Sequence, residues 1–248
     1  MKRTVSLLIA LALPLVAGAQ DKAAAPAAAP KSKVISSYYV SVKDGHDAAF
    51  RAALVAHAKK FHKGENAWRV GDVRSGPHGN MYQIVEGPST WTALDGRGDL
   101  GPEHTKDYET NVMPHVASTT PDVYAVYEDD FSTVATAQWS SKVLINRLVA
   151  KPGCSSHLGD ALAMLKKCNE KRGLNTAVWR TFGSGPAAYA VVYRLKNGWK
   201  DFDDDSPGLR KTMNEIYGPN GYENYMRIIA NNAAESSSEL VEYPADLQ

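Results

Sequence analysis

Histidine has the widest chemical range of any residue type in this chain, because imidazole can hold a metal ion, ligate haem or move a proton near neutral pH. Seven histidines occur among the 248 residues. His57 and His62 lie five residues apart within a predicted helix, so they are not expected to share a face. His104 and His115 lie eleven apart, where proline and glycine interrupt the helix that would align them. No H-x-x-x-H pair occurs, so the sequence predicts no metal site and no resident cofactor.

Other signatures of catalysis are missing from the sequence. There is no G-x-S-x-G nucleophile elbow, no P-loop and no dinucleotide fingerprint. Ser75 and Ser184 each precede Gly-Pro, a pattern typical of a turn and not of a nucleophile. Ligation of haem by one histidine needs no such motif, and His57 and His115 are the candidates for that alternative.

Two Trp-Arg dipeptides, Trp68 with Arg69 and Trp179 with Arg180, combine aromatic and basic groups. The tryptophans could wall a ligand pocket in which the guanidinium groups grip an anionic or carbonyl oxygen. Alternatively, each tryptophan packs in the core and each arginine extends its aliphatic stem toward solvent. Because the dipeptide recurs in both halves of the chain, the sequence favours this second interpretation, in which the dipeptide maintains the fold.

The recurrence extends over almost all of the chain. Residues 34–94 align with residues 143–202, and the offset between matching positions stays between 107 and 111. The matches run in order and include two tryptophans and a Ser-Gly-Pro turn, which chance does not explain. Because this period is too long for a solenoid repeat, it indicates a duplicated domain. The repeats are assigned to residues 34–130 and 139–248, with residues 131–138 as the linker.

Both repeats have the same predicted order of elements, namely strand, helix, two strands, an interrupted helix and a final strand. This βαββαβ order is that of the ferredoxin-like fold. The predicted strands cover residues 36–42, 67–73, 80–86 and 123–128 in the first repeat, and 143–149, 177–182, 188–195 and 238–243 in the second. The predicted helices cover residues 46–63, 88–115, 156–171 and 206–233.

A single ferredoxin-like sheet has helices on one face and leaves the other face bare. The first strand of each repeat has no uniformly polar side, so both faces of each sheet are expected to be covered. The simplest cover is the other repeat. The sequence therefore predicts an α+β fold in which two tandem ferredoxin-like repeats pack their antiparallel sheets into one α+β barrel, as a monomer.

Tyr39 and Arg147 occupy equivalent positions on the first strands of the two repeats. In a closed barrel both side chains could face the interior. A buried arginine needs an anionic partner, which would be either an acid such as Glu86 or an anionic ligand. Of these two, an internal salt bridge is the preferred interpretation.

The layout of residues 34–243 resembles the dimeric α+β barrel superfamily in its tandem form, which includes NIPSNAP-like proteins and antibiotic-biosynthesis monooxygenases. The resemblance implies a small hydrophobic or aromatic ligand. It also suggests cofactor-independent oxidation of an activated aromatic, with His57 as the base. Haem- or stress-related binding and a structural role in the cell envelope are the alternatives. The residues alone do not distinguish an enzyme from a binding protein.

The beginning of the chain is typical of an exported protein. Residues 1–19 combine Lys2 and Arg3 with an apolar stretch and Ala-Gly-Ala, which predicts a signal peptide cleaved before Gln20. Residues 20–33 are rich in alanine and proline and form a predicted spacer. No later stretch is long and apolar enough to cross a membrane, so we expect a periplasmic or secreted protein.

Charge and cysteine content narrow the function classes further. The net charge is +1, and acidic and basic residues are interspersed. We therefore expect no nucleic-acid partner, because nucleic acids are bound largely through positive charge. Cys154 and Cys168 lie near opposite ends of the predicted helix 156–171, which separates them by about 20 Å. Since bridged Cα atoms lie within ~7 Å of each other, we expect two free thiols.

Overall fold

The computed structural model describes residues 33–98, 100–134, 139–203 and 207–248. The chain divides into two units, Met1–Pro30 and Lys31–Gln248, and the second contains all the described residues. The predicted signal peptide, the spacer up to residue 32 and part of the predicted linker lie outside them. No helix in the described part of the chain is long and apolar enough to cross a membrane.

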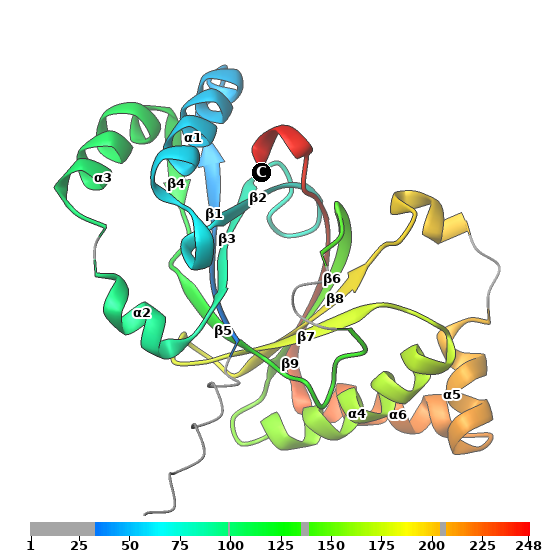
Figure 1. The fold of residues 1–248 in the computed structure, drawn as a ribbon. Helices are drawn as coiled ribbons and strands as arrows, with labels where there is room; N and C mark the ends of the chain where they lie inside the picture. The colour runs from blue at the N-terminus through cyan, green and yellow to red at the C-terminus, as the bar shows by residue number, and fades with distance from the viewer. Residues whose placement is uncertain (1–32, 99, 135–138, 204–206) are drawn as a thin grey trace, which may run out of the picture. The chain divides into compact units, whose positions relative to one another are not determined.

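Nine strands form one antiparallel sheet that closes on itself into a barrel (Figure 1). The strands are β1 (Val34–Val42), β2 (Trp68–Ser75), β3 (Tyr82–Ser89), β4 (Val116–Thr119), β5 (Val123–Tyr127), β6 (Lys142–Ala150), β7 (Thr176–Thr181), β8 (Ala188–Arg194) and β9 (Ala233–Glu242). Around the barrel the order is β3, β2, β9, β6, β8, β7, β5 and β1, and pairing of β1 with β3 completes the circle. The short β4 pairs with the end of β1, on the side where β5 pairs with its beginning.

The two repeats meet along two seams, where β2 pairs with β9 and β5 pairs with β7. At each seam the second strand of one repeat lies beside the last strand of the other. The bare face of each sheet therefore becomes the inside of the barrel, and the sheet edges are hydrogen-bonded to each other. This arrangement confirms the predicted α+β fold of tandem ferredoxin-like repeats that form one barrel.

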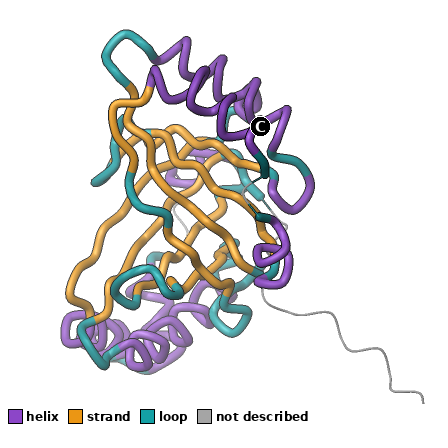
Figure 2. The backbone as a smooth tube through the Cα atoms, turned by 90° about the vertical axis from the view of Figure 1, so that its left-hand side faces the viewer, coloured by secondary structure: helices purple, strands orange, loops and turns teal. Residues whose placement is uncertain are grey.

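Helices cover the outside of the barrel on two opposite sides, one for each repeat (Figures 1 and 2). Phe50 and Leu54 are buried against the first-repeat strands, and Leu158 and Leu162 against the second-repeat strands. The helices are α1 (Asp47–Phe61), α2 (Trp91–Arg97), α3 (Pro102–Asp107), α4 (Ser155–Lys171), α5 (Leu209–Tyr217) and α6 (Gly221–Asn232). A π-helical turn (Tyr108–Val112) and 3₁₀ turns (Gly64–Asn66, Met113–His115, Gly198–Asp203 and Ala245–Leu247) complete the set.

Two strands differ from the sequence-based expectation. The predicted elements do not include β4, and β9 begins at Ala233 although the predicted strand begins at residue 238. The start of β9 is polar and has no strand-like alternation, but it pairs with β6 along its whole length. Pairing with a buried neighbour thus overrides local propensity. Both cysteines are free at the two ends of α4, as predicted.

Candidate functional site

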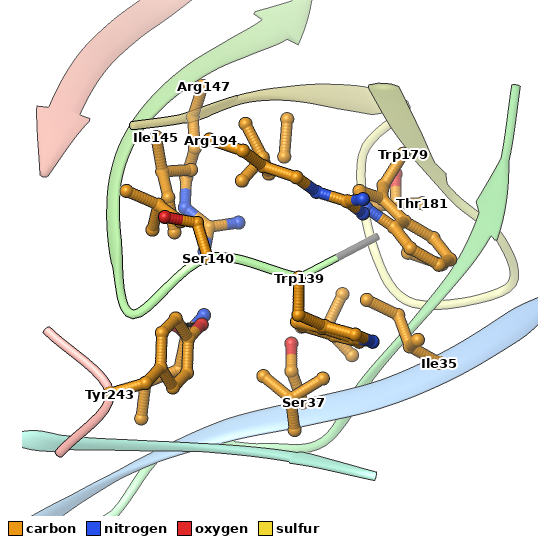
Figure 3. Close-up of a pocket in the computed structure, with 17 residues that line it drawn as sticks. Ile35, Ser37, Trp139, Ser140, Ile145, Arg147, Trp179, Thr181, Arg194 and Tyr243 are labelled. Atoms are coloured by element: carbon orange, nitrogen blue, oxygen red, sulfur yellow. Dashed lines mark hydrogen bonds between the residues drawn. The ribbon is translucent and has the colours of Figure 1, made fainter. Parts of the chain in front are cut away.

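Alternate residues of each strand face the inside of the barrel, which encloses a cavity of only about 60 Å³ (Figure 3). Trp139 is one of the residues that line it, and the guanidinium groups of Arg69 and Arg194 lie 3.9 and 5.5 Å from the centre of the Trp139 ring system. Trp179 forms part of the wall. A cavity that accommodates benzene measures ~150 Å³. The barrel interior is therefore too small for an aromatic ligand.

Tyr39 and Arg147 meet inside the barrel. Arg147 Nη2 donates to Tyr39 Oη at 2.5 Å, and Tyr39 Oη donates to Glu239 Oε2 at 2.7 Å. Arg147 Nε lies 3.8 Å from the same carboxylate oxygen. The internal acid beside Arg147 is thus Glu239 of β9, and the suggested Glu86 is wrong, because Glu86 faces the outside of the barrel. Burial raises the pKa of Tyr39 well above its usual value.

His78 completes this internal cluster. Its ring stacks on Tyr39 with a centroid distance of 3.8 Å and an interplanar angle of 11°, and its Nδ1 contacts Glu239 Oε1. The carboxylate of Glu239, fully buried, therefore interacts with tyrosine, arginine and histidine at once. The polar groups of the cluster bind mainly one another. The cluster therefore serves to hold the two repeats together.

The two Trp-Arg dipeptides do not occupy equivalent places in the barrel. Trp68 pairs with Glu86 across the first hairpin and faces the helices, whereas Trp179 pairs with Ala190 and faces the interior. The two arginines also lie on opposite faces of the barrel wall. Arg69 lies inside the barrel, whereas Arg180 lies at the outer surface, where its Nε is 2.5 Å from Glu128. The strand pairings place Trp179 at the position equivalent to Gly71 and not to Trp68. The sequence match is therefore displaced by three residues, an odd number that exchanges the two faces of a strand.

Trp68 forms part of a cavity of about 230 Å³ between the first-repeat sheet and its helices. We call this cavity the outer pocket. Its walls are aromatic on several sides, and its polar groups come from segments that are far apart in the sequence. The lining residues are Ser36, Tyr38, His62, Trp68, Glu86, Leu94, Arg97, His104, Tyr108, Asp122 and Tyr124.

Local sequence explains how the helices reach the outer pocket. Thr90 caps α2 through a hydrogen bond from Ala93 N to its side chain, and Gly98 ends that helix with a φ of 61°. Gly101, with a φ of 88°, then turns the chain, and Pro102 begins α3. The glycines that interrupt the predicted long helix thus create a bend that brings α2 and α3 over the sheet.

Glu86 is the central polar group of the outer pocket. Its Oε2 accepts hydrogen bonds from Trp68 Nε1 at 2.8 Å and from Arg97 Nη2 at 3.0 Å. His62 Nδ1 lies 3.3 Å from the same oxygen, and the His62 ring stacks on Trp68. The Nε of Arg97 is buried and has no hydrogen-bond partner among the described residues. Arg97 therefore lines the pocket with a guanidinium group that these residues leave partly unpaired.

Three histidines gather beside the outer pocket, against the expectation that His57 and His62 point apart. The helix α1 ends at Phe61, so His62 already belongs to the departing chain and turns back toward the helix. His62 Nε2 and His104 Nε2 are 3.2 Å apart, and the His57 ring centroid lies 4.8 Å from that of His104. Burial lowers the pKa of His57 and of His104, which favours their neutral forms.

His57, the candidate base, is fully buried and does not line the outer pocket. Its Nδ1 is 2.8 Å from Asp107 Oδ2, and its Nε2 has no hydrogen-bond partner in the described part of the chain. Any action of His57 on a ligand in the pocket must therefore pass through His62 or His104. His115, the other candidate for haem, lies at the surface in contact with His46.

The second repeat has no corresponding group of histidines among its described residues. Its two larger cavities, of about 550 and 440 Å³, lie beside the outer face of β6 and β8. Neither is lined by a histidine. The haem-binding alternative therefore finds no axial imidazole at these two cavities.

Sequence reasoning did not identify His104, Arg97 or Glu239 as parts of a site. Each acquires its neighbours only through long-range packing. The single local signal was the run of glycines before α3, which marks the bend that places His104.

No family model and no curated protein sequence matches this chain. Among solved structures, a proposed monooxygenase from Lactobacillus acidophilus NCFM has 10% identity and a TM-score of 0.53, covering 85% of this chain and 93% of its own. A proposed monooxygenase from Fusobacterium nucleatum has 12% identity and a TM-score of 0.54, covering 86% and 94%. A mutant chlorite dismutase from Candidatus Nitrospira defluvii has 7% identity and a TM-score of 0.50, covering 88% and 94%. These similarities establish the fold alone, an α+β barrel that this chain shares with them.

Proposed function

We propose that the protein binds a small aromatic molecule bearing an anionic or carbonyl oxygen, and that the outer pocket is the binding site. The observation that supports this proposal is the combination of aromatic walls with the unpaired, buried Nε of Arg97. Aromatic side chains favour a flat apolar ring. A guanidinium donor favours a carboxylate, phenolate or carbonyl oxygen.

The size of the outer pocket limits the ligand to about one ring. Its volume of about 230 Å³ exceeds the ~150 Å³ cavity that holds benzene. It is smaller than the ~300–1,000 Å³ of pockets for drug-sized ligands. A substituted benzene therefore fits the available space better than a fused-ring compound or a tetrapyrrole does.

Binding is measurable by calorimetry with benzoate and 4-hydroxybenzoate as probes. Cyclohexanecarboxylate carries the same charge without an aromatic ring and should bind more weakly. Arg97→Gln should weaken benzoate binding by about 10-fold or more, because a hydrogen bond to a charged group contributes ~1.5–3 kcal/mol. The control is Arg210→Gln, which changes an exposed second-repeat ion pair with Glu223 and should leave binding unchanged. Equal binding to wild type and Arg97→Gln would refute this site.

Oxidation of the bound aromatic by dioxygen, without a cofactor, is the enzymatic form of this proposal. Two proteins of the same fold are described as proposed monooxygenases. The bases that line the pocket are His62 and His104, and His57 would position them from behind. Uptake of dioxygen in the presence of a single-ring hydroquinone tests this form. Ligand binding without uptake would restrict the protein to a binding role.

We also propose that the protein is exported and acts as a monomer in the periplasm or outside the cell. The amino-terminal pattern of residues 1–19 supports export. Closure of the barrel within one chain supports the monomer. Amino-terminal sequencing after expression in a bacterium should begin at Gln20, and sedimentation should give the mass of one mature chain. Retention of residues 1–19, or an obligate dimer, would contradict these statements.

A further inference from the structure

We propose that His57, His62 and His104 form a binding site for one divalent first-row transition-metal ion. This inference goes beyond the proposed binding of an aromatic molecule and does not depend on it. The three side chains come from α1, from the residue that follows α1 and from α3. They are brought together only by the fold.

The spacing of the ring nitrogens fits a small ion. One nitrogen from each histidine can be chosen so that all three lie within 4.8 Å of one another. The distance of 3.2 Å between His62 Nε2 and His104 Nε2 is close to the separation of two ligands on one tetrahedral ion. With zinc–nitrogen bonds of ~2.0–2.1 Å, that separation is about 3.4 Å. Small side-chain shifts are enough to bring the third nitrogen into place.

An unsatisfied nitrogen points to a missing partner at this place. His57 Nε2 is buried and has no hydrogen-bond partner among the residues that the structure describes. A buried polar atom without a partner is costly, and His57 is fully buried. Coordination of an ion by His57 Nε2 would remove that cost. In the metal-free cluster, the contact between His62 and His104 satisfies only one nitrogen of each ring.

Carboxylates stand behind two of the three imidazoles. Asp107 Oδ2 lies 2.8 Å from His57 Nδ1, and Glu86 Oε2 lies 3.3 Å from His62 Nδ1. A carboxylate behind a metal-binding histidine holds the proton on the far nitrogen, so the near nitrogen presents its lone pair. Lys60 and Arg97 contact these same carboxylates and balance their charge when no ion is bound.

The place of the cluster beside the outer pocket defines the kind of metal site. Three protein ligands leave one position open on a tetrahedral ion, as in catalytic and not in structural zinc sites. His62 and His104 line the outer pocket, so a water molecule or a ligand oxygen could reach that position from the pocket. Three imidazole ligands suit Zn²⁺, Co²⁺, Cu²⁺, Ni²⁺ and Fe²⁺ better than Mg²⁺ or Ca²⁺.

The test is titration of the full mature chain, stripped with a chelator, with Co²⁺ and Zn²⁺ in the absence of any aromatic ligand. We expect one equivalent of Co²⁺ to bind with the visible bands of a tetrahedral nitrogen site, and Zn²⁺ to displace it. His104→Ala and His104→Gln should weaken Zn²⁺ binding by more than about 100-fold. Asp107→Asn should weaken it by about 10- to 100-fold, the usual effect of losing such a carboxylate.

The matched control is His115→Ala. His46 and His115 also bring two ring nitrogens to 3.0 Å, but at an exposed site with no third histidine within that contact. This variant should retain full binding. Circular dichroism of each variant verifies folding, and Zn²⁺ should raise the melting temperature of the wild type but not of the His104 variants. Full binding in both folded His104 variants, or absence of binding in the wild type, would overturn the proposal.

Because the titration contains no aromatic ligand, failure of metal binding is separable from failure of benzoate binding. The result also bears on mechanism. A coordinated ion occupies the lone pairs that cofactor-independent base chemistry would require from His62 and His104.

Discussion

The hydroxyl of Tyr39 donates a 2.7 Å hydrogen bond to Glu239, which lies 200 residues later in the chain. Tyr39 belongs to the first strand and Glu239 to the last. Arg147, from the first strand of the second repeat, contacts both groups. One buried contact therefore ties together both ends of the duplicated unit.

Replacing Glu239 by alanine should lower the free energy of unfolding by about 1.5–3 kcal/mol, because it removes the buried hydrogen bond from Tyr39 and leaves the partly buried charge of Arg147 without its partner. Urea unfolding measures the loss. The control on the same strand is Glu242→Gln, whose ion pairs with Arg74 and Lys142 are nearer the surface and should contribute about 0–1 kcal/mol. Similar losses for the two variants would contradict the central position assigned to Glu239.

Replacing Gly71 by alanine should destabilise the protein by about 1–3 kcal/mol through overpacking. A Cβ atom at Gly71 would lie 2.6 Å from Val241 and 2.9 Å from Tyr243, at the seam between β2 and β9. Thermal unfolding provides the comparison. Gly96→Ala is the matched control, because that glycine lies in α2 with open space around it, and alanine should stabilise the helix slightly. If Gly71→Ala leaves the stability unchanged, the two strands at the seam can move apart without a loss of stability, and the prediction is wrong.

Alkaline pH should unfold the protein through its buried tyrosines. Burial, followed by the hydrogen bond to Asp47, raises the pKa of Tyr82 to about 12, and burial also raises the pKa of Tyr39 and Tyr243. An unfolded tyrosine loses its proton near pH ~10. Above that pH the folded state holds more protons than the unfolded state, so stability falls as pH rises.

The measurement is urea unfolding at about pH 9 and pH 11, together with the ultraviolet absorbance of tyrosinate. Tyr82→Phe should reduce the loss of stability between these two pH values. If all twelve tyrosines of the folded protein titrate together near their ordinary pKa, this prediction is wrong.

The two thiols should differ greatly in reactivity. Cys168 is fully buried in α4 and burial raises its pKa, so little thiolate forms there. Cys154 precedes the helix and is partly exposed. A thiol reagent should modify one cysteine per native chain and two in denaturant. Mass spectrometry of the non-reduced protein should show no bond between them, and detection of such a bond would contradict the rigid separation by α4.

The fold could be predicted because its signals are local and occur twice. The spacing of Phe50 and Leu54 indicates a helix, the β-branched and aromatic residues around Tyr39 indicate a strand, and the second repeat gives the same order of elements. The pairing of Tyr39 with Arg147 followed from that order. Their acidic partner did not, because Glu239 reaches them only through the long-range pairing of β9 with β6 and β2, which no local pattern contains.

The site could not be predicted in the same way. Aligning the two repeats by residue identity matched Trp68 with Trp179, but the structure places these side chains on opposite faces of the barrel wall. Sequence similarity does not reveal a displacement by an odd number of residues, which exchanges the two faces of a strand and so changes its contacts. His62 contacts His104 because α1 ends at Phe61 and because the chain bends before α3. The spacing of residues along a continuous helix predicts neither feature.

The position of β9 has a consequence for the order of folding. This strand is the last in the chain, and it lies between β2 of the first repeat and β6 of the second. Until residues 233–242 leave the ribosome, β2 and β6 have no neighbour at this seam. The barrel can therefore close only after residues 233–242 have been made, and the sheet of the first repeat is enclosed only when this segment of the second repeat is in place.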